Sequence, residues 1–149
     1  MELELFITEE GFQELLQSKA NLEKDLQKLR EEKKEFSVSP SSNNEDYLAI
    51  EEEIQNILEN ISKKNDIINK VIIQPTPTKN EIVVFGKKVI IENLDTEEKN
   101  TYQIVGTFES DLSKNKISNI CPMGKVLIGK TIEEEFYLND YDYKIIGIE

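Results

Sequence analysis

The feature that most constrains the fold is a stripe of apolar side chains that recurs every three or four residues. Its members are Tyr47, Ile50, Ile54, Ile57, Ile61 and Ile68. A similar stripe precedes it, formed by Phe12, Leu15, Leu16, Leu22, Leu26, Leu29 and Phe36. Alternating steps of three and four are typical of helices that pack in a coiled coil. The sequence therefore predicts two long helices, each with one apolar face.

A turn-forming segment, SVSPSSNN at residues 37–44, separates the two stripes. Pro and clustered Ser and Asn favour turns and end helices, so the chain is expected to reverse direction there. Two helices that are joined by a short turn pack antiparallel. Thr8 precedes the first stripe and is expected to cap its helix. The prediction is an antiparallel coiled-coil hairpin over residues 1–74, with its tip at about residues 37–46.

The composition changes after residue 74. Pro75 and Pro77 keep the backbone extended, so residues 75–80 are expected to form a linker. Five of the six glycines follow it. Short β-branched runs broken by turn residues predict strands at residues 82–85, 89–91, 101–105, 135–138 and 143–146. Pro122 and Gly129 bracket a short helix, because Pro is favoured in a first helical turn and Gly just past the end.

These patterns together predict the α+β fold class. An N-terminal antiparallel helical hairpin is followed by a small antiparallel β-sheet domain with one short helix, at residues 81–149. The first domain exposes most of each helix, because one stripe per helix buries a single seam. Runs of Glu and Lys on these helices are therefore expected to be solvated faces.

Acidic residues outnumber basic ones by 30 to 18, which leaves a net charge of −12. Binding to DNA or RNA through the phosphate backbone needs a basic surface. Neither sequence-independent nor direct sequence-specific binding to nucleic acid is therefore expected. The charge fits a protein partner with basic surfaces, or solubility alone.

The residue types that are missing exclude several kinds of site. The chain has no His, so it has no Ser-His-Asp triad, Cys-His dyad or His-rich metal site. Cys121 is the single cysteine and can form no internal disulfide, so a reducing cytoplasm is expected. No apolar run approaches the roughly 20 residues that span a bilayer, and no membrane association is expected. Any chemistry that remains must come from carboxylates, Lys, Tyr, Ser, Thr or the backbone.

Short motifs in both halves resemble the Gre family of bacterial transcript cleavage and elongation factors. They are TEEG (residues 8–11), VFG (84–86), NLDTEE (93–98), TYQIVG (101–106), ESD (109–111), IS (117–118) and CPMGKVLIGK (121–130). Their number, order and spacing make a chance resemblance a poor explanation. The resemblance implies that the C-terminal domain is similar to the FKBP fold and that the chain has no enzyme activity, metal or cofactor of its own. We expect a monomer.

The resemblance also implies a partner, which is RNA polymerase. Members of the family dock on the polymerase through the globular domain, and the helical hairpin enters the secondary channel. There, two acids of a D-x-x-E-N-A-E-Y motif at the tip help to hold a second Mg²⁺, and the polymerase's own centre hydrolyses backtracked RNA. Carboxylates that recruit a cation can activate water and stabilise the leaving oxygen. The docking positions implied by the match are Cys121, Pro122 and Met123.

The tip of this chain departs from that motif. Counting back from Tyr47 aligns Asn44 with the motif's Asn and places the two acids on Pro40 and Asn43. The tip residues in this register are Asn43, Asn44 and Tyr47. Pro40 carries no ligand oxygen on its side chain, and Asn43 offers only a neutral one.

The other register, counted forward from Thr8, places the two acids on Ser42 and Glu45. Neither register supplies both carboxylates, so stimulation of cleavage is expected to be weak or absent. Alternatively, Glu45 and Asp46 substitute for the missing pair and help to hold the polymerase's Mg²⁺. Two further alternatives remain from other classes: a prolyl isomerase, by analogy of fold alone, and a coiled-coil adaptor unrelated to transcription.

Overall fold

The computed structural model describes residues 4–38 and 44–149, and these form two compact units. One unit is a helical hairpin of residues 12–70. The other is a globular unit that combines residues 4–11 with residues 71–149. The boundary drawn from the sequence stood at residue 74, whereas the structure groups the segments on either side of the hairpin with the globular unit.

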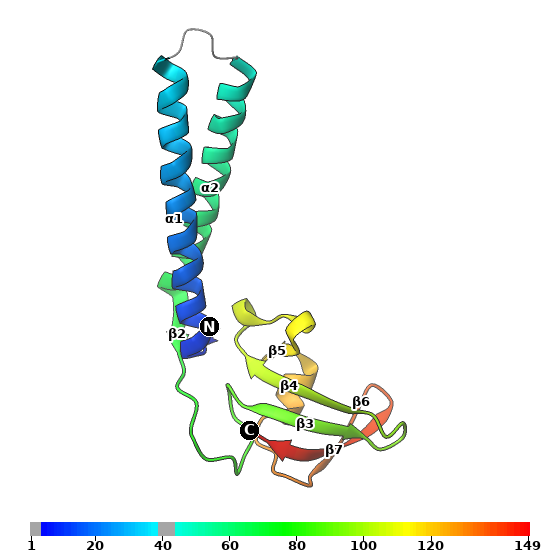
Figure 1. Cartoon of the computed structure of the whole chain (residues 1–149). Coiled ribbons are helices and arrows are strands. Elements are labelled where there is room, and N and C mark those ends of the chain that lie inside the picture. The colour runs from blue at the N-terminus through cyan, green and yellow to red at the C-terminus, as the bar shows by residue number, and fades with distance from the viewer. Residues whose placement is uncertain (1–3, 39–43) are drawn as a thin grey trace. The chain divides into compact units, whose positions relative to one another are not determined.

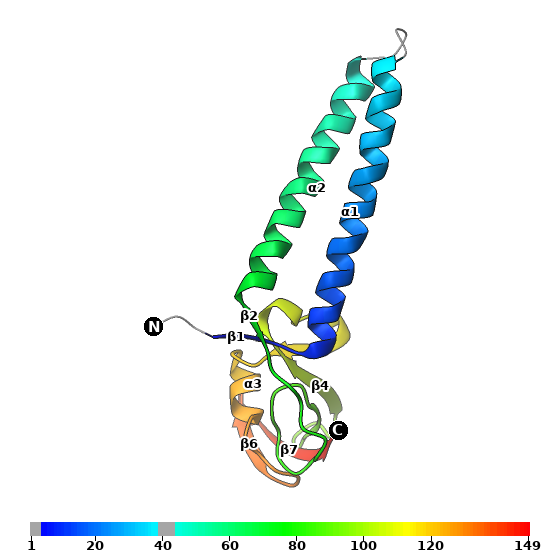
Figure 2. The same cartoon turned by 90° about the vertical axis from the view of Figure 1, so that its left-hand side faces the viewer.

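The hairpin consists of α1 (Glu9–Val38) and α2 (Asn44–Lys70), which run antiparallel and side by side (Figures 1 and 2). Its core is a single seam. The buried members are Leu26, Leu29 and Ile54, and Ile50, Ile57, Leu58 and Ile61 pack against them. All but Leu58 belong to the predicted stripes, which confirms the coiled-coil hairpin. Leu16 lies in the first stripe but is exposed, because the seam does not cover that part of the helix surface.

Two three-residue strands flank the hairpin in sequence, and both belong to the globular unit. β1 (Leu5–Ile7) pairs in parallel with β2 (Val71–Ile73), with Leu5 opposite Val71. Ile7, at the end of β1, is only 2% exposed. Such short strands carry too few residues for a detectable alternation, and β2 directly follows a helix. The sequence therefore did not indicate them.

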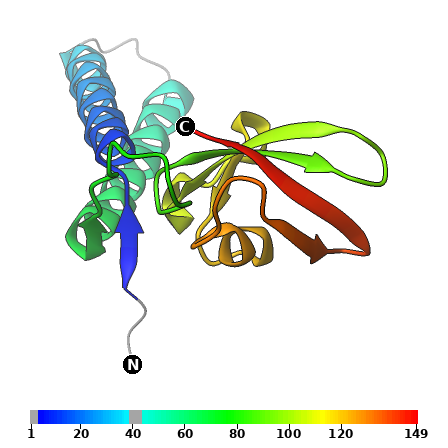
Figure 3. The same ribbon diagram turned by 90° about the horizontal axis from the view of Figure 1, so that it is seen from below.

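The globular unit contains a five-stranded sheet in the order β5-β4-β3-β7-β6 (Figures 1 and 3). Its strands are β3 (Lys88–Asn93), β4 (Lys99–Val105), β5 (Lys116–Ser118), β6 (Glu135–Leu138) and β7 (Tyr141–Ile148). Neighbouring strands are antiparallel except for the edge pair β4–β5, which is parallel. The predicted α+β class is confirmed, and the parallel edge is a feature that the sequence did not indicate.

The short helix α3 (Pro122–Leu127) packs on this sheet through Leu127, which is fully buried. The shared core consists of Val83, Val89, Ile91, Ile104, Ile117, Leu127, Phe136, Ile145 and Ile148. The helix begins and ends as expected, with Pro122 in its first turn and Gly129 just beyond it. Within residues 4–38 and 44–149, no helix has an apolar stretch long enough for a bilayer crossing.

Residues 82–85, predicted as a strand, do not form one. Ile82 makes a single bridge to Thr131, and the Val83 amide donates to the Lys130 carbonyl across 2.8 Å. A turn follows at Gly86, whose φ of +91° is a backbone conformation that favours glycine.

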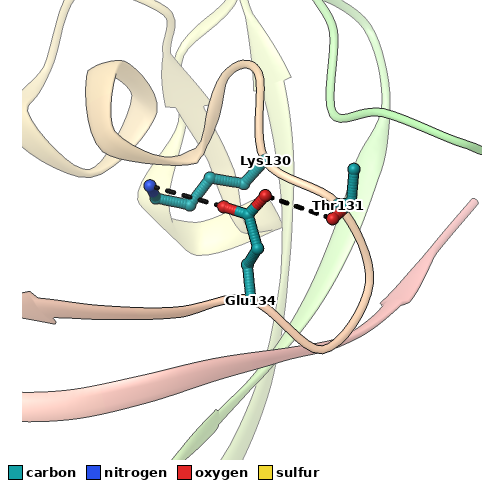
Figure 4. A network of polar contacts seen from close by, with 3 residues as sticks. All are labelled: Lys130, Thr131 and Glu134. Carbon is teal, nitrogen blue, oxygen red and sulfur yellow. Dashed lines mark hydrogen bonds and ion pairs between the residues drawn. The ribbon is translucent and has the colours of Figure 1, made fainter.

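The segment that contains Thr131 is held in place by its own side chains. Glu134 accepts a hydrogen bond from Thr131 and lies 3.8 Å from the Lys130 ammonium (Figure 4).

Candidate functional site

The start of α1 is bound to the carboxylate of Glu109, the last residue of a short 3₁₀ helix (Thr107–Glu109) in the same globular unit. Thr8 caps the helix as predicted, because its Oγ1 accepts a hydrogen bond from the Gly11 amide across 3.0 Å. Glu109 Oε2 accepts from the amides of Thr8, at 2.9 Å, and Gly106, at 3.0 Å. The Thr8 hydroxyl donates to the other carboxylate oxygen. One side chain therefore satisfies donors from two separate segments.

Two glycines make room for this arrangement. A Cβ on Gly11 would lie 1.9 Å from Glu109 Oε1, and one on Gly106 would lie 1.8 Å from the Phe6 carbonyl oxygen. Both distances are far below a van der Waals contact, so neither position accepts a larger side chain without rearrangement. The sequence motifs at residues 8–11, 101–106 and 109–111 therefore meet at one place. The motifs were visible in the sequence, but their common role was not.

The candidate acids of the hairpin lie at the beginning of α2. Glu45 and Asp46 are both exposed in its first turn. Successive residues of an α-helix point about 100° apart, so the two carboxylates leave the helix in different directions. Pro40, Ser42 and Asn43, the other candidate positions, lie outside the described residues. Asn44 is the first residue of α2.

Tyr47 lies one turn into α2, where it contacts α1. It is half-buried, and the Lys33 ammonium lies 5.4 Å from the centre of its ring. Lys33 also forms an ion pair with Glu51 across 3.0 Å. The hydrogen bond that Lys33 donates to Glu51, with smaller contributions from the charges of Glu51 and Tyr47, raises the pKa of Lys33. Tyr47 therefore takes part in a contact between the helices.

The three predicted docking residues surround the start of α3. Cys121 is the N-cap, and its Sγ accepts a hydrogen bond from the Gly124 amide across 3.3 Å. Pro122 is exposed, whereas Met123 is half-buried and packs against the core of the globular unit. Of the expected apolar anchor, Pro122 therefore supplies the part that a partner could touch.

A groove of about 210 Å³ adjoins Cys121. Its other walls include Asp111, Leu112 and Ile117. Leu112 is 79% exposed, which is unusual for a leucine, and it lines this groove together with Cys121, the residue before Pro122. The hydroxyl and amide of Ser113 donate to Asp111, and together with the nearby lysines they lower its pKa. The sequence did not single out Leu112, because a lone leucine in a polar loop carries no periodic signal.

Among the described residues, no three His, Cys, Asp or Glu side chains gather closely enough to hold a metal ion. Glu45 and Asp46 are thus not joined by a third such ligand within these ranges.

Comparisons with known proteins agree with the motifs. The family model for the C-terminal part of the transcription elongation factors GreA and GreB matches residues 78–149. Transcription elongation factor GreA of Staphylococcus saprophyticus is 39% identical, over 96% of this chain and 95% of that protein. The GreA of Thermosipho africanus is 32% identical, over 97% of this chain and 96% of that protein.

Solved structures with a similar chain include the GreA factor homolog 1 (Gfh1) proteins of two Thermus species. The Thermus thermophilus protein is 23% identical, with a TM-score of 0.46 and 99% of both chains covered. The Thermus aquaticus protein is 24% identical, with a TM-score of 0.47 and 97% of both chains covered. The relationship to the family rests on the sequence identities to the GreA proteins.

Proposed function

This chain belongs to the GreA/GreB family of transcription elongation factors, and from that premise we propose that it binds bacterial RNA polymerase and inserts its helical hairpin in the secondary channel. The observation that carries the proposal is the similarity to GreA along 96% of the chain. A hairpin of two helices packed through one seam is slender enough for such a role. The chain acts as a monomer and is not itself the enzyme, because hydrolysis belongs to the polymerase.

The second part of the proposal is that this factor stimulates transcript cleavage weakly or not at all. Its support is the residues at the tip. In one register the two acid positions hold Pro40 and Asn43, and in the other they hold Ser42 and Glu45. A cation shared with the polymerase loses at least one anionic ligand in either register. That loss should weaken its binding by several kcal/mol and leave the water without its activating ion.

The competing function, active cleavage, is favoured by one observation: Glu45 and Asp46 are both exposed at the start of α2. The two side chains diverge by about 100° around the helix, so they are poorly placed to hold one cation together. A single carboxylate of the pair could still contact a Mg²⁺ that the polymerase holds. We therefore regard obstruction of the channel, or competition with a cleavage-competent relative, as the main activity.

A transcript cleavage assay on a backtracked elongation complex tests this. We expect the protein to leave the RNA at the length seen with polymerase alone and to slow cleavage by an added active GreA. Efficient shortening of the RNA by the protein alone would contradict the proposal. If that shortening is lost in the Glu45→Ala/Asp46→Ala variant and kept in Asp66→Ala, the competing function is correct.

Two gain-of-function variants identify the register of the tip. Pro40→Asp/Asn43→Glu restores both acids in the register counted from Tyr47, and Ser42→Asp restores the pair with Glu45 in the other. We expect one of these variants, and not the other, to stimulate cleavage. If neither does so while both still bind polymerase, the lack of acids is not the reason for weak cleavage.

The docking surface is tested separately by co-purification with polymerase. The proposal places Pro122 and its neighbours Cys121 and Met123 at the contact, with Leu112 beside them. A charged side chain in an apolar contact loses affinity through desolvation, so Pro122→Asp and Leu112→Asp should abolish binding. Leu94→Asp, an exposed leucine in the turn between β3 and β4, is the matched control and should bind normally. Retention of Pro122→Asp on polymerase counts against this docking surface.

A further inference from the structure

A second pocket, of about 290 Å³, lies in the globular unit and is lined by Lys88, Lys114 and Lys116, the last of which it shares with the docking groove. Two of these lysines belong to one row across three adjacent strands. Lys88 of β3 is opposite Gln103 of β4, and Gln103 is opposite Lys116 of β5. Residues directly opposite each other in neighbouring strands project from the same face of a sheet. Lys88 and Lys116 therefore lie on the same face of the sheet, one on each side of Gln103.

This row lies on the face of the sheet that points away from the core. The following residues, Val89, Ile104 and Ile117, are buried in the core. Side chains alternate between the two faces along a strand, so the row faces the other way. Lys88 is exposed and Lys116 is half-buried, which leaves the ammonium groups accessible from solvent.

Within residues 4–38 and 44–149, none of the four ion pairs involves Lys88, Lys114 or Lys116. One acid, Glu10, also lines the pocket and belongs to the same unit. Three lysines and one carboxylate line the pocket. Glu149, whose backbone exchanges two hydrogen bonds with that of Lys88, and Asp111, which forms a bridge with Lys116, lie beside the pocket and offset part of this charge.

Lys114 and Lys116 also lower the pKa of a nearby carboxylate, that of Asp111. The pKa of Asp111 is lowered first by hydrogen bonds from Ser113 and then by the charges of Lys114 and Lys116. Those two lysines therefore already favour an anion at their edge of the sheet. Asp111 does not line the pocket itself.

We propose that this pocket binds a phosphate group with two or more negative charges, either free or at the end of a nucleotide. The strands that carry Lys88 and Lys116 are two spacings apart, about 10 Å, which flexible lysine side chains can bridge around one anion. Thr101 and Asn115 also line the pocket and offer hydrogen-bond donors for further oxygens. Its volume is at the lower end for ligand pockets, which suits a small anion.

The proposal does not depend on polymerase binding and can be tested on the isolated full-length chain. Inorganic pyrophosphate is titrated at constant ionic strength, and backbone amide shifts are followed by NMR. We expect saturable shifts at residues of the row and at 114–116. Lys88→Gln and Lys116→Gln should each weaken the affinity about tenfold, the usual scale for losing one charge-assisted contact.

Two further variants keep the test discriminating. Glu10→Gln removes the one carboxylate and should tighten binding about threefold, by relief of like-charge repulsion. Lys125→Gln removes an exposed lysine that does not line the pocket and should change nothing. Amide spectra of each variant show whether the sheet is intact, and Glu10→Gln tests the pocket even if a lysine variant fails to fold.

Titrations with pyrophosphate and with ADP distinguish binding of a free anion from binding of a nucleotide. Binding of pyrophosphate but not ADP supports a free anion, and binding of ADP at equal or higher affinity supports a nucleotide. Absence of saturable shifts with both ligands overturns the proposal. It is also overturned if Lys125→Gln weakens binding as much as Lys88→Gln, because the attraction is then general.

Discussion

Glu109 and Thr8 are 101 positions apart in the chain, yet Glu109 Oε2 lies 2.9 Å from the Thr8 amide nitrogen. The same carboxylate accepts hydrogen bonds from the Thr8 hydroxyl and from the Gly106 amide. The start of a helix leaves several amides without partners inside the helix. Here Thr8 supplies one partner for Gly11, and Glu109 supplies the partner for the cap residue itself.

Removing this carboxylate should destabilise the globular unit. Glu109→Ala leaves the amides of Thr8 and Gly106 without their acceptor, and we expect a loss of about 2 kcal/mol in the free energy of unfolding. Urea unfolding measures the loss, and amide hydrogen exchange at Thr8 and Gly106 locates it. Glu81→Ala, an exposed glutamate of the same unit, is the control and should unfold like the wild type. Unchanged exchange at both amides would show that the carboxylate is dispensable.

The effect of Gly11→Ala should change sign with residue 109. Alanine in a helix is normally more stable than glycine by about 0.5–1 kcal/mol. In the wild type the new Cβ meets the Glu109 carboxylate and displaces it, so we expect net destabilisation. In a Glu109→Ala background the three closest atoms are gone, and Gly11→Ala should stabilise. A double-mutant cycle by urea unfolding measures this coupling, and additive effects would disprove it.

The hairpin depends on its single seam. Ile54 is 7% exposed and packs with Leu26 and Leu29, so Ile54→Ala should cost about 2 kcal/mol, at the lower end for a buried isoleucine because the seam is thin. Leu48 is 60% exposed in the same helix, and Leu48→Ala should stay within about 0.5 kcal/mol of the wild type. Thermal loss of helical circular dichroism distinguishes the two. Equal effects would mean that the helices do not pack through this seam.

Asp111 should titrate below the ordinary range of an aspartate. Ser113 hydrogen bonds and the charges of Lys114 and Lys116 lower its pKa in the folded state. Its contribution to stability is therefore present above the pKa of the unfolded chain and is lost as the pH falls through the folded-state pKa. Ser113→Ala should raise the pKa, as measured by carboxyl ¹³C NMR, while Ser110→Ala should not. An equal pKa in wild type and Ser113→Ala would rule out this hydrogen bond as the cause.

The sequence predicted some of the candidate sites better than others. The lack of acids at the tip follows from the sequence alone, because positions 40, 42 and 43 hold Pro, Ser and Asn. The docking residues followed from a motif, but only the structure shows that Pro122 is exposed while Met123 packs inward. Leu112 and the lysine row carried no signal, since neither forms a local pattern.

The sequence by itself determined the helical hairpin, the α+β class and the charge of −12, because periodicity, turn residues and composition act over a few neighbouring positions. The tertiary structure decided which distant residues meet. It placed Glu109 against Thr8 and aligned Lys88, Gln103 and Lys116 across three strands. Strand order and register bring such residues together through hydrogen bonds between segments far apart in the chain, and no local spacing records them.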